Sequence, residues 1–324
     1  MTSPDRVFNQ GTMTYLSCFI QEERVAWEKR LWLQLALRYD YAFFHRGRFE
    51  ALGEQVADFN QYNGALKNNH WEHFSPKIAL RFTPFAKLST YISYAHGFRA
   101  SILDDLCRSG WMWVGPKVAN PELKPEQLEQ YEWGINWTIS PQCSFTSSLY
   151  YAVGDDFLYY VATGEKMWGK REIYRRENVS KVELKGVEVD LNFLPLNGFT
   201  LHMNCTYSLS KIKDFQEQPE LVGKRLTYAP EVQWKGYLVW TRNRMDIMLR
   251  GCYRSKQYTT EDNLTYLPDF STWDFQVSHS FFHNRFLLQA EILNLFEKRY
   301  LNADQHISIG RVVNLKWTLN LNRQ

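Results

Sequence analysis

The chain has 324 residues, a formal net charge of +3 and a mean hydropathy of −0.45. It holds no run of about 18 or more apolar residues, which excludes a membrane-spanning helix, and its Lys and Arg residues form no stripe of the kind that indicates a nucleic-acid partner. The five cysteines lack metal-type spacing and are interpreted as isolated small hydrophobic residues. No metal site and no cofactor are predicted.

Segments in which apolar and polar residues alternate recur along the whole chain. In residues 31–41, Leu or Tyr occupies every second position, and Trp32 is the one large exception. Side chains of a strand point alternately to opposite faces, so such a segment predicts a strand with one apolar and one polar wall. The same alternation follows at 131–139, 199–209, 273–278 and 313–321.

These segments are about ten residues long, which is the length that a tilted strand needs to cross a bilayer. Strands of soluble proteins are usually about five or six residues long. In lipid, strands satisfy their backbone only in a closed sheet. We therefore predict an all-β fold, an antiparallel up-and-down transmembrane β-barrel. About 13 strands make it an incomplete barrel, because bacterial single-chain barrels have even strand numbers.

Connections between the predicted strands alternate between tight and long. Tight turns are expected at 28–30, 83–85, 140–142, 196–198, 241–243 and 282–284, and long polar loops near 45–70, 98–127, 155–172, 212–225, 257–268 and 297–308. Short periplasmic turns and longer extracellular loops are typical of outer-membrane barrels. The paired acids Asp104–Asp105 and Asp155–Asp156 fall in predicted extracellular loops, where we expect solvated charge.

The alternation also predicts which side chains share a face. The apolar set is expected on the convex, lipid-facing side and comprises Leu201, Met203, Phe286, Leu288, Ile292, Trp317 and Leu319. The polar set is expected to line a hydrated concave lumen and comprises Arg38, Asp40, Lys77, Arg81, Glu132, Asp246, Arg250, Asp274, Gln289 and Glu291.

Several motifs, in order along the chain, resemble those of TonB-dependent outer-membrane receptors. The first runs from Asn120-Pro121 through Leu123, Pro125 and Glu126 to Gly134, and it resembles the family segment that leads from an extracellular loop into a strand. The others are Gly186 with Glu188, then Asn294-Leu295-Phe296, and Gly310-Arg311 before the final strand. We interpret all of these residues as barrel architecture. In this interpretation, Gly186 relieves crowding in a twisted strand or marks a bulge.

The resemblance implies that residues 1–324 are the C-terminal portion of a receptor barrel in the bacterial outer membrane, without a plug domain. The implied function is TonB-dependent uptake of a scarce nutrient, most often a ferric siderophore and otherwise haem, cobalamin or a glycan. The implied partners are outer-membrane lipid, the barrel-assembly machinery, the N-terminal half of the barrel, and TonB acting through the plug.

The sequence departs from that family at both ends. No signal peptide, TonB box or plug precedes the first strand, and the chain ends on Leu321-Asn322-Arg323-Gln324 instead of an aromatic residue. A split gene, a frameshift or a partial chain would each explain this. We expect that the chain alone does not transport, because its edge strands need partners in lipid.

Solute contacts in such a receptor come from loops and the upper lumen, where aromatic and cationic side chains suit anionic, ring-rich iron chelates. The candidates are Arg99, Trp111, Trp113, Tyr159, Tyr160, Trp168 and Arg171. Nothing in the sequence indicates an enzyme, since it has no phosphate loop, nucleophile elbow or ligand cluster. Two other functions stay open: a passive porin-like channel, and a non-transport barrel or surface binding protein.

Overall fold

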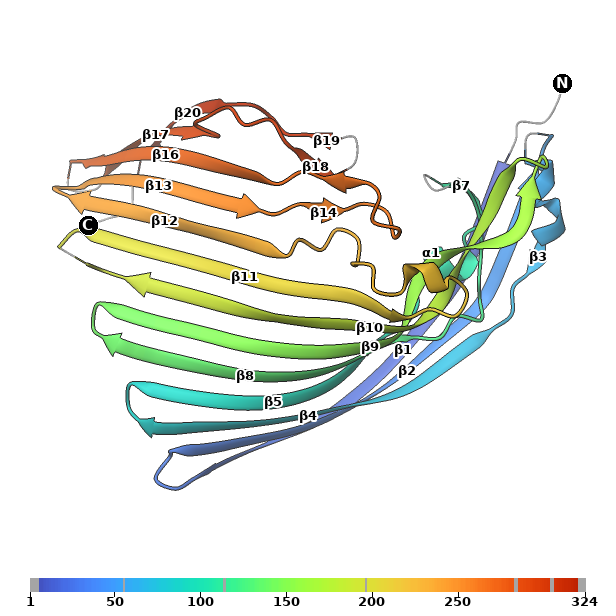
Figure 1. The fold of residues 1–324 in the computed structure, drawn as a ribbon, viewed down its shortest axis with the longest axis horizontal. Coiled ribbons are helices and arrows are strands. Elements are labelled where there is room, and N and C mark those ends of the chain that lie inside the picture. Colours follow the sequence, from blue (N-terminus) through green and yellow to red (C-terminus); the bar gives the residue numbers. More distant parts are fainter. Residues whose placement is uncertain are drawn as a thin grey trace.

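The computed structural model describes residues 6–54, 56–112, 115–195, 197–282, 285–303 and 306–319 (Figure 1). Thirteen strands form one continuous antiparallel path. In order, they are β1 (Arg6–Ala26), β2 (Leu31–Leu52), β4 (Asn69–Phe85), β5 (Leu88–Arg99), β8 (Glu126–Ser140), β9 (Cys143–Met167), β10 (Arg171–Phe193), β11 (Phe199–Asp214), β12 (Val232–Arg242), β13 (Met245–Arg254), β16 (Phe270–Phe281), β17 (Phe286–Leu293) and β20 (Val312–Leu319).

Short elements lie in the connections between these strands. Three of them belong to the main sheet but lie off its path: β3 (Gly64–Ala65) pairs with β2, β7 (Gly115–Val118) pairs with β10, and β6 (Gly110–Met112) pairs with β7. Two small hairpins stand apart, β14 (Gln257–Tyr258) with β15 (Tyr266–Leu267), and β18 (Leu301–Ala303) with β19 (His306–Ile307). The helical elements are η1 (Ala57–Tyr62), α1 (Leu103–Cys107) and η2 (Pro219–Leu221). Within the described ranges, no helix is long and apolar enough to cross a membrane.

The sheet bends strongly, as Figure 1 shows, and it remains open. No ladder between described residues joins β1 to β20, the two ends of the strand order. The all-β, antiparallel, incomplete barrel of about 13 strands is therefore confirmed. Along the main path every pairing connects strands that follow each other, as predicted. The exception is β7, which pairs in parallel with β10 at Lys117–Tyr174 and Val118–Arg175.

Strands extend further into the loop end than the sequence indicated. Residues 155–172 were expected to form a loop, but β9 continues to Met167 and β10 begins at Arg171, which leaves a turn of three residues. The 25 residues of β9 span about 80 Å at roughly 3.3 Å per residue, far more than a bilayer requires. Outside the membrane both faces of a strand are wetted, so the apolar alternation that revealed the lower strands is lost there.

Strand register confirms the predicted apolar face. Leu201 pairs with Leu238, which pairs in turn with Leu249. The same row continues through Phe275 and Ile292 to Val313. Directly paired residues of a ladder lie on the same face of the sheet. Trp317 pairs with Leu288 and Leu319 with Phe286, and so belong to this face.

The polar residues lie on the opposite face, and ion pairs connect several of them. Arg250 pairs in register with Asp274, at 2.9 Å between Nη2 and Oδ2, and reaches Glu291 at 3.4 Å. At the other end of the sheet, Arg38 donates to Asp40 at 2.7 Å. The predicted polar face is thus confirmed.

The connection between β5 and β8, described at residues 100–112 and 115–125, folds onto this polar face instead of extending into solvent. Leu106 and Leu123 are buried against Phe44 and Trp71 of β2 and β4, and the Trp71 indole Nε1 donates to the Leu123 carbonyl at 2.9 Å. From there the connection reaches across β8 and β9 to pair with β10 (Figure 1). We call residues 100–112 and 115–125 the inward loop.

Two glycines of the predicted motifs leave room for tyrosine rings on the inner face. A Cβ atom at Gly134 would lie 2.3 Å from the Tyr91 ring, and one at Gly186 would lie 2.5 Å from the Tyr150 hydroxyl oxygen and 2.3 Å from a backbone carbonyl. The Tyr150 hydroxyl donates to Ser208 at 2.7 Å. A Cβ atom has no room at Gly186, which agrees with the expectation that this glycine relieves crowding.

Candidate solute-binding site at the loop end

Three of the predicted solute-contact residues meet at the tip of the loop end. The Trp111 and Trp168 rings lie 5.2 Å apart between centroids, and the Arg171 guanidinium lies 5.4 Å from the centre of the Trp111 ring. The Phe59 ring of η1 meets Trp111 edge-on at 6.4 Å. Trp111 is 37% exposed and Trp168 56%, so both indoles are open to solvent. We call these four residues the aromatic cluster.

Local backbone geometry positions the cluster. Trp111 lies on β6, whose hairpin with β7 pairs Trp111 with Pro116. Trp168 and Gly169 form the turn between β9 and β10 with φ values of 53° and 65°. Such left-handed residues close tight turns, and here the turn carries the indole toward Trp111. Residues more than 50 positions apart in the chain thus form one surface.

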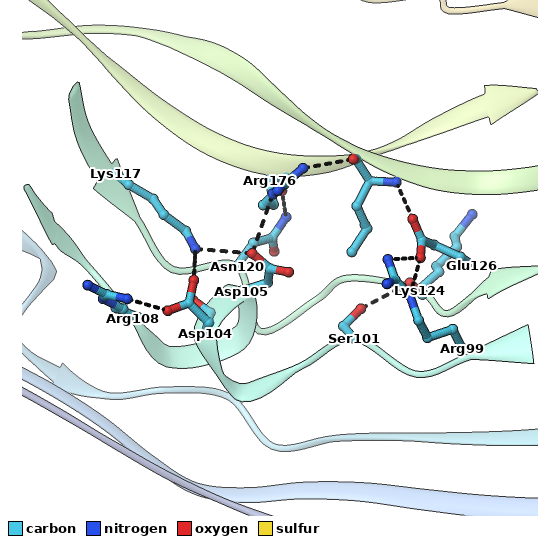
Figure 2. A network of polar contacts seen from close by, with 11 residues as sticks. Arg99, Ser101, Asp104, Asp105, Arg108, Lys117, Asn120, Lys124, Glu126 and Arg176 are labelled. Carbon is cyan, nitrogen blue, oxygen red and sulfur yellow. Dashed lines mark hydrogen bonds and ion pairs between the residues drawn. The ribbon is translucent and has the colours of Figure 1, made fainter. Parts of the chain in front are cut away.

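A buried lysine, Lys117, holds the inward loop together through several polar contacts (Figure 2). Lys117 is fully buried. Its ammonium donates to the Asp104 carbonyl at 2.8 Å, to Asp104 Oδ2 at 3.0 Å and to Asp105 Oδ1 at 3.1 Å. The Tyr160 ring covers it at 5.7 Å. A buried charge is tolerated only when it is paired and hydrogen-bonded in this manner.

Arg176 of β10 ties the same loop to the sheet. Its guanidinium lies 3.9 Å from the centre of the Tyr160 ring, with Nε 3.4 Å from Asp105 Oδ1, and Nη1 donates to the Leu158 carbonyl at 2.9 Å. The Asn120 side chain donates to the Arg176 carbonyl at 2.9 Å (Figure 2). The Tyr160 ring therefore packs against two internal cations, Lys117 and Arg176. Asn120 links the inward loop to β10 by a hydrogen bond.

The expectation of solvated charge at Asp104–Asp105 is wrong. Asp105 is only 7% exposed, because Lys117 and Arg176 approach it from β7 and β10. Burial alone would raise the pKa of Asp104, but the hydrogen bonds from Arg108 and Lys117 hold that pKa below its ordinary value. These carboxylates are structural anchors. Asp155 and Asp156 keep more exposure and lie near Lys181 and Lys124 at 3.9 and 3.8 Å.

The remaining candidates lie away from the aromatic cluster. Arg99 pairs with the buried carboxylate of Glu126, which also accepts the Leu158 backbone N–H at 3.0 Å. Tyr159 is buried against Phe215 in a separate apolar cluster, so it presents no surface to a solute. Trp113 lies outside the described residues.

Several of the other motif residues form hydrogen bonds that stabilise loops and turns. Pro121 and Leu123 accept hydrogen bonds from Asn69 and Trp71, and Pro125 connects them to Glu126. Asn294 exchanges hydrogen bonds with the backbone of Lys298 at 2.8 Å in both directions. Arg311, after Gly310, donates to the Leu295 carbonyl at 3.1 Å. Phe296 is exposed, and Glu188 lies on the inner face two residues from Gly186.

The aromatic cluster can bind a flat or ring-bearing anion. Two indole faces offer stacking surface, and Arg171 offers a cation with several donors in one plane. Among the described residues, no group of three or more His, Cys, Asp or Glu side chains could hold a metal ion.

A curved wall of long antiparallel strands, apolar outside and polar inside, defines the chain as an outer-membrane β-barrel protein. Comparison with protein-family models matches residues 2–295 to the TonB dependent receptor-like β-barrel. The chain belongs to this family of bacterial outer-membrane transport receptors.

Among curated proteins, the chain is 22% identical over 303 residues to the ferrioxamine B receptor of Salmonella typhimurium, covering 91% of this chain and 40% of that receptor. The ferric yersiniabactin uptake receptor FyuA from Yersinia pestis has a similar structure, with a TM-score of 0.74, 15% identity, and coverage of 97% of this chain and 46% of that one.

The siderophore receptor PiuA from Acinetobacter baumannii gives a TM-score of 0.75 at 18% identity, with coverage of 94% and 43%. The copper transporter OprC gives 0.73 at 14% identity, with coverage of 95% and 47%. The chain thus spans less than half the length of these relatives, and at these identities the structural similarity concerns the fold.

Proposed function

We propose that this chain is part of the barrel wall of a receptor for TonB-dependent uptake of a ferric siderophore. The observation that carries the proposal is the aromatic cluster, which offers Trp111, Trp168 and Arg171 to the solvent at the loop end. Several of the similar proteins are named as siderophore receptors. The chemistry is transport without catalysis.

The partners in this proposal follow from family membership. The outer face contacts membrane lipid, and the barrel-assembly machinery inserts the strands. The chain covers 40% of its curated relative, so the rest of the wall and the plug come from sequence beyond this match. TonB acts through the plug, and the edges of β1 and β20 are where further strands pair.

The aromatic cluster favours an anionic chelate with aromatic rings, such as a ferric catecholate, over a ring-free hydroxamate such as ferrioxamine B. Stacking on an indole requires an aromatic ring, and pairing with Arg171 requires a negative charge; of the two classes, only the ferric catecholate has both. Haem, which is also flat and anionic, is the second solute that this surface fits.

Quenching of tryptophan fluorescence tests the proposal on the receptor in detergent. A ferric catecholate should quench saturably, and Arg171→Gln should weaken its binding about ten-fold, the value of one charge-assisted hydrogen bond. Trp111→Ala should weaken binding to a similar degree. Lys213→Gln and Trp133→Ala, which change the outer face, are the matched controls. Equal losses in the controls, or tighter binding of ferrioxamine B, would refute the assignment.

A further inference from the structure

At the short-turn end, three exposed arginines lie on two neighbouring turns. Arg242 ends β12, Arg244 lies in the turn to β13, and Arg285 precedes β17. All three are exposed. The two turns touch, since the Ser280 backbone N–H donates to the Arg244 carbonyl at 2.9 Å. We call these three residues the arginine patch.

The charge of the arginine patch is not neutralised within the described part of the chain. None of its guanidinium groups has a hydrogen bond or an ion pair with a described residue. The nearest acid along the strand, Asp246, lies on the inner face, where it accepts from the Thr241 hydroxyl at 2.7 Å and lies 3.5 Å from the Ser278 hydroxyl. Three positive charges are thus concentrated at one place on the short-turn rim of the barrel wall.

Aromatic side chains place the patch at the boundary between hydrocarbon and water. On the outer face, Phe281 contacts Phe286 at 6.0 Å and His279 at 4.4 Å between ring centroids. Trp240 lies two residues from Arg242 and contacts Phe199 at 6.2 Å. Phe282, in the turn itself, is 74% exposed. A girdle of this kind marks the membrane interface of a barrel.

An apolar groove lies above the patch on the same strands and the same outer face. Gly236 of β12 lines a hollow of about 430 Å³ together with Leu238, Leu249 and Trp273 among others. The Trp273 ring packs over Gly251, the register partner of Gly236. Leu238 is four residues from Arg242 on β12, or about 13 Å at roughly 3.3 Å per residue. An acyl chain that extends into the membrane from a headgroup at the patch would pass over this groove.

We propose that this surface binds one anionic phospholipid of the periplasmic leaflet. Short turns of outer-membrane barrels face the periplasm, so the patch lies at the headgroups of that leaflet. The phosphate is held by Arg242, Arg244 and Arg285 through charge-assisted hydrogen bonds, and an acyl chain lies in the groove over Gly236. The proposal rests on the outer-membrane location and is independent of the solute.

The opposite part of the same rim provides a matched control. Lys29 and Arg30 in the turn from β1 to β2, with Lys87 in the turn from β4 to β5, are also exposed. Their surroundings differ, because Glu22, Glu23 and Glu28 belong to the same hairpin. Replacing these three cations changes the net charge by the same amount without affecting the arginine patch.

Lipid titrations followed by native mass spectrometry, on the protein in detergent, test the proposal with phosphatidylglycerol as the probe. Replacing all three arginines with Gln should weaken binding by about 100-fold, since each basic side chain at an anionic membrane surface contributes about five-fold. Single Arg244→Gln should lose about five-fold and serves if the triple variant does not fold. Lys29→Gln, Arg30→Gln and Lys87→Gln together should change binding by less than about two-fold.

Two further arms separate the lipid from simpler anions. Phosphatidylethanolamine and short-chain phosphatidylglycerol should both bind more weakly than long-chain phosphatidylglycerol, and inorganic phosphate should not compete at millimolar concentration. Equal losses in the two triple variants, equal binding of the two headgroups, or competition by free phosphate would each overturn the proposal.

Discussion

Replacing Lys117 with methionine should release the inward loop while the barrel wall stays folded. Methionine keeps the length and apolar stem of the side chain but removes the buried ammonium. Asp104 and Asp105 then lose donors at 3.0 and 3.1 Å, and the Asp104 carbonyl loses one at 2.8 Å. The carboxylate of Asp105 stays buried with only Arg176 as its charged partner, at 3.4 Å.

The loss of docking free energy in the Lys117→Met variant follows from these contacts. Removing one member of a buried ion pair typically costs about 3–5 kcal/mol. Arg176 still faces Asp105 and Arg108 still pairs with Asp104 at 2.7 Å, so the low end applies, about 3 kcal/mol. That value corresponds to an increase of about 100-fold in the population of the undocked loop.

Hydrogen exchange measures this population directly, because local opening exposes amides without global unfolding. The backbone N–H groups of Asp105 and Asn120, bonded at 3.0 Å to Ile102 and Asp105, should exchange about 100-fold faster in the variant. Amides between β12 and β13 should not change. Lys166→Met is the control, since Lys166 is half exposed and its pair with Glu172 at 3.0 Å contributes at most about 1 kcal/mol. Unchanged protection in the inward loop of the Lys117 variant would refute the reasoning.

Three further predictions concern the lipid-facing side of the sheet, the crowded glycine Gly134 and the carboxylate of Asp104. Leu201→Arg should reduce the heat-modifiable, inserted form, because Arg on the lipid face costs about 2–4 kcal/mol near the midplane, while His202→Arg should insert normally; equal yields would invalidate the face assignment. Gly134→Ala should lower the melting temperature because its Cβ would meet the Tyr91 ring at 2.3 Å, whereas Gly97→Ala, with nothing within 4 Å, should not. Adding Tyr91→Ala should recover part of the loss, and no recovery would contradict the steric explanation. The pKa of Asp104 is held below its ordinary value of 3.8, so its contribution to loop docking is complete above that value and is lost as pH falls through the lowered pKa; hydrogen exchange of the inward loop should accelerate in acid, and Asp104→Asn should show a smaller acceleration.

Membrane-spanning strands were predictable because lipid imposes the alternation. In β20 every second residue from Val313 to Leu319 is apolar, and register places all of them on the outer face. The same rule fails outside the bilayer. Residues 155–167 continue β9 with Asp155, Asp156 and two tyrosines, and no apolar period reveals a strand that water wets on both sides.

The aromatic cluster was predictable only in part. Residue type selected Trp111, Trp168 and Arg171, because large aromatic and cationic side chains stand out in polar loops. The sequence could not separate them from Tyr159 and Tyr160, which point to opposite faces of β9 and are respectively buried against Phe215 and covered by Arg176.

The buried ion pairs of Asp105 could not be predicted from the sequence, because the residues that form them are distant along the chain. Asp105 meets Lys117 from the same loop and Arg176 from β10, 71 positions away. Neighbouring acids in a polar loop are usually solvated, and only the folding of the inward loop onto the sheet brings cations to them. Asn120, which the sequence identified only as a motif residue of the barrel, lies beside this network, because its backbone N–H donates to the Asp105 carbonyl and its side chain donates to the Arg176 carbonyl of β10.

Uptake of radioactive iron as a ferric catecholate, in iron-starved cells that produce the receptor containing this chain, tests the central claim most directly. Uptake should require TonB, and the double variant Trp111→Ala with Arg171→Gln should reduce it by at least about ten-fold at equal barrel levels, while Trp137→Ala on the outer face should leave it unchanged. Uptake that persists without TonB, or that is the same in the double variant, would contradict the account.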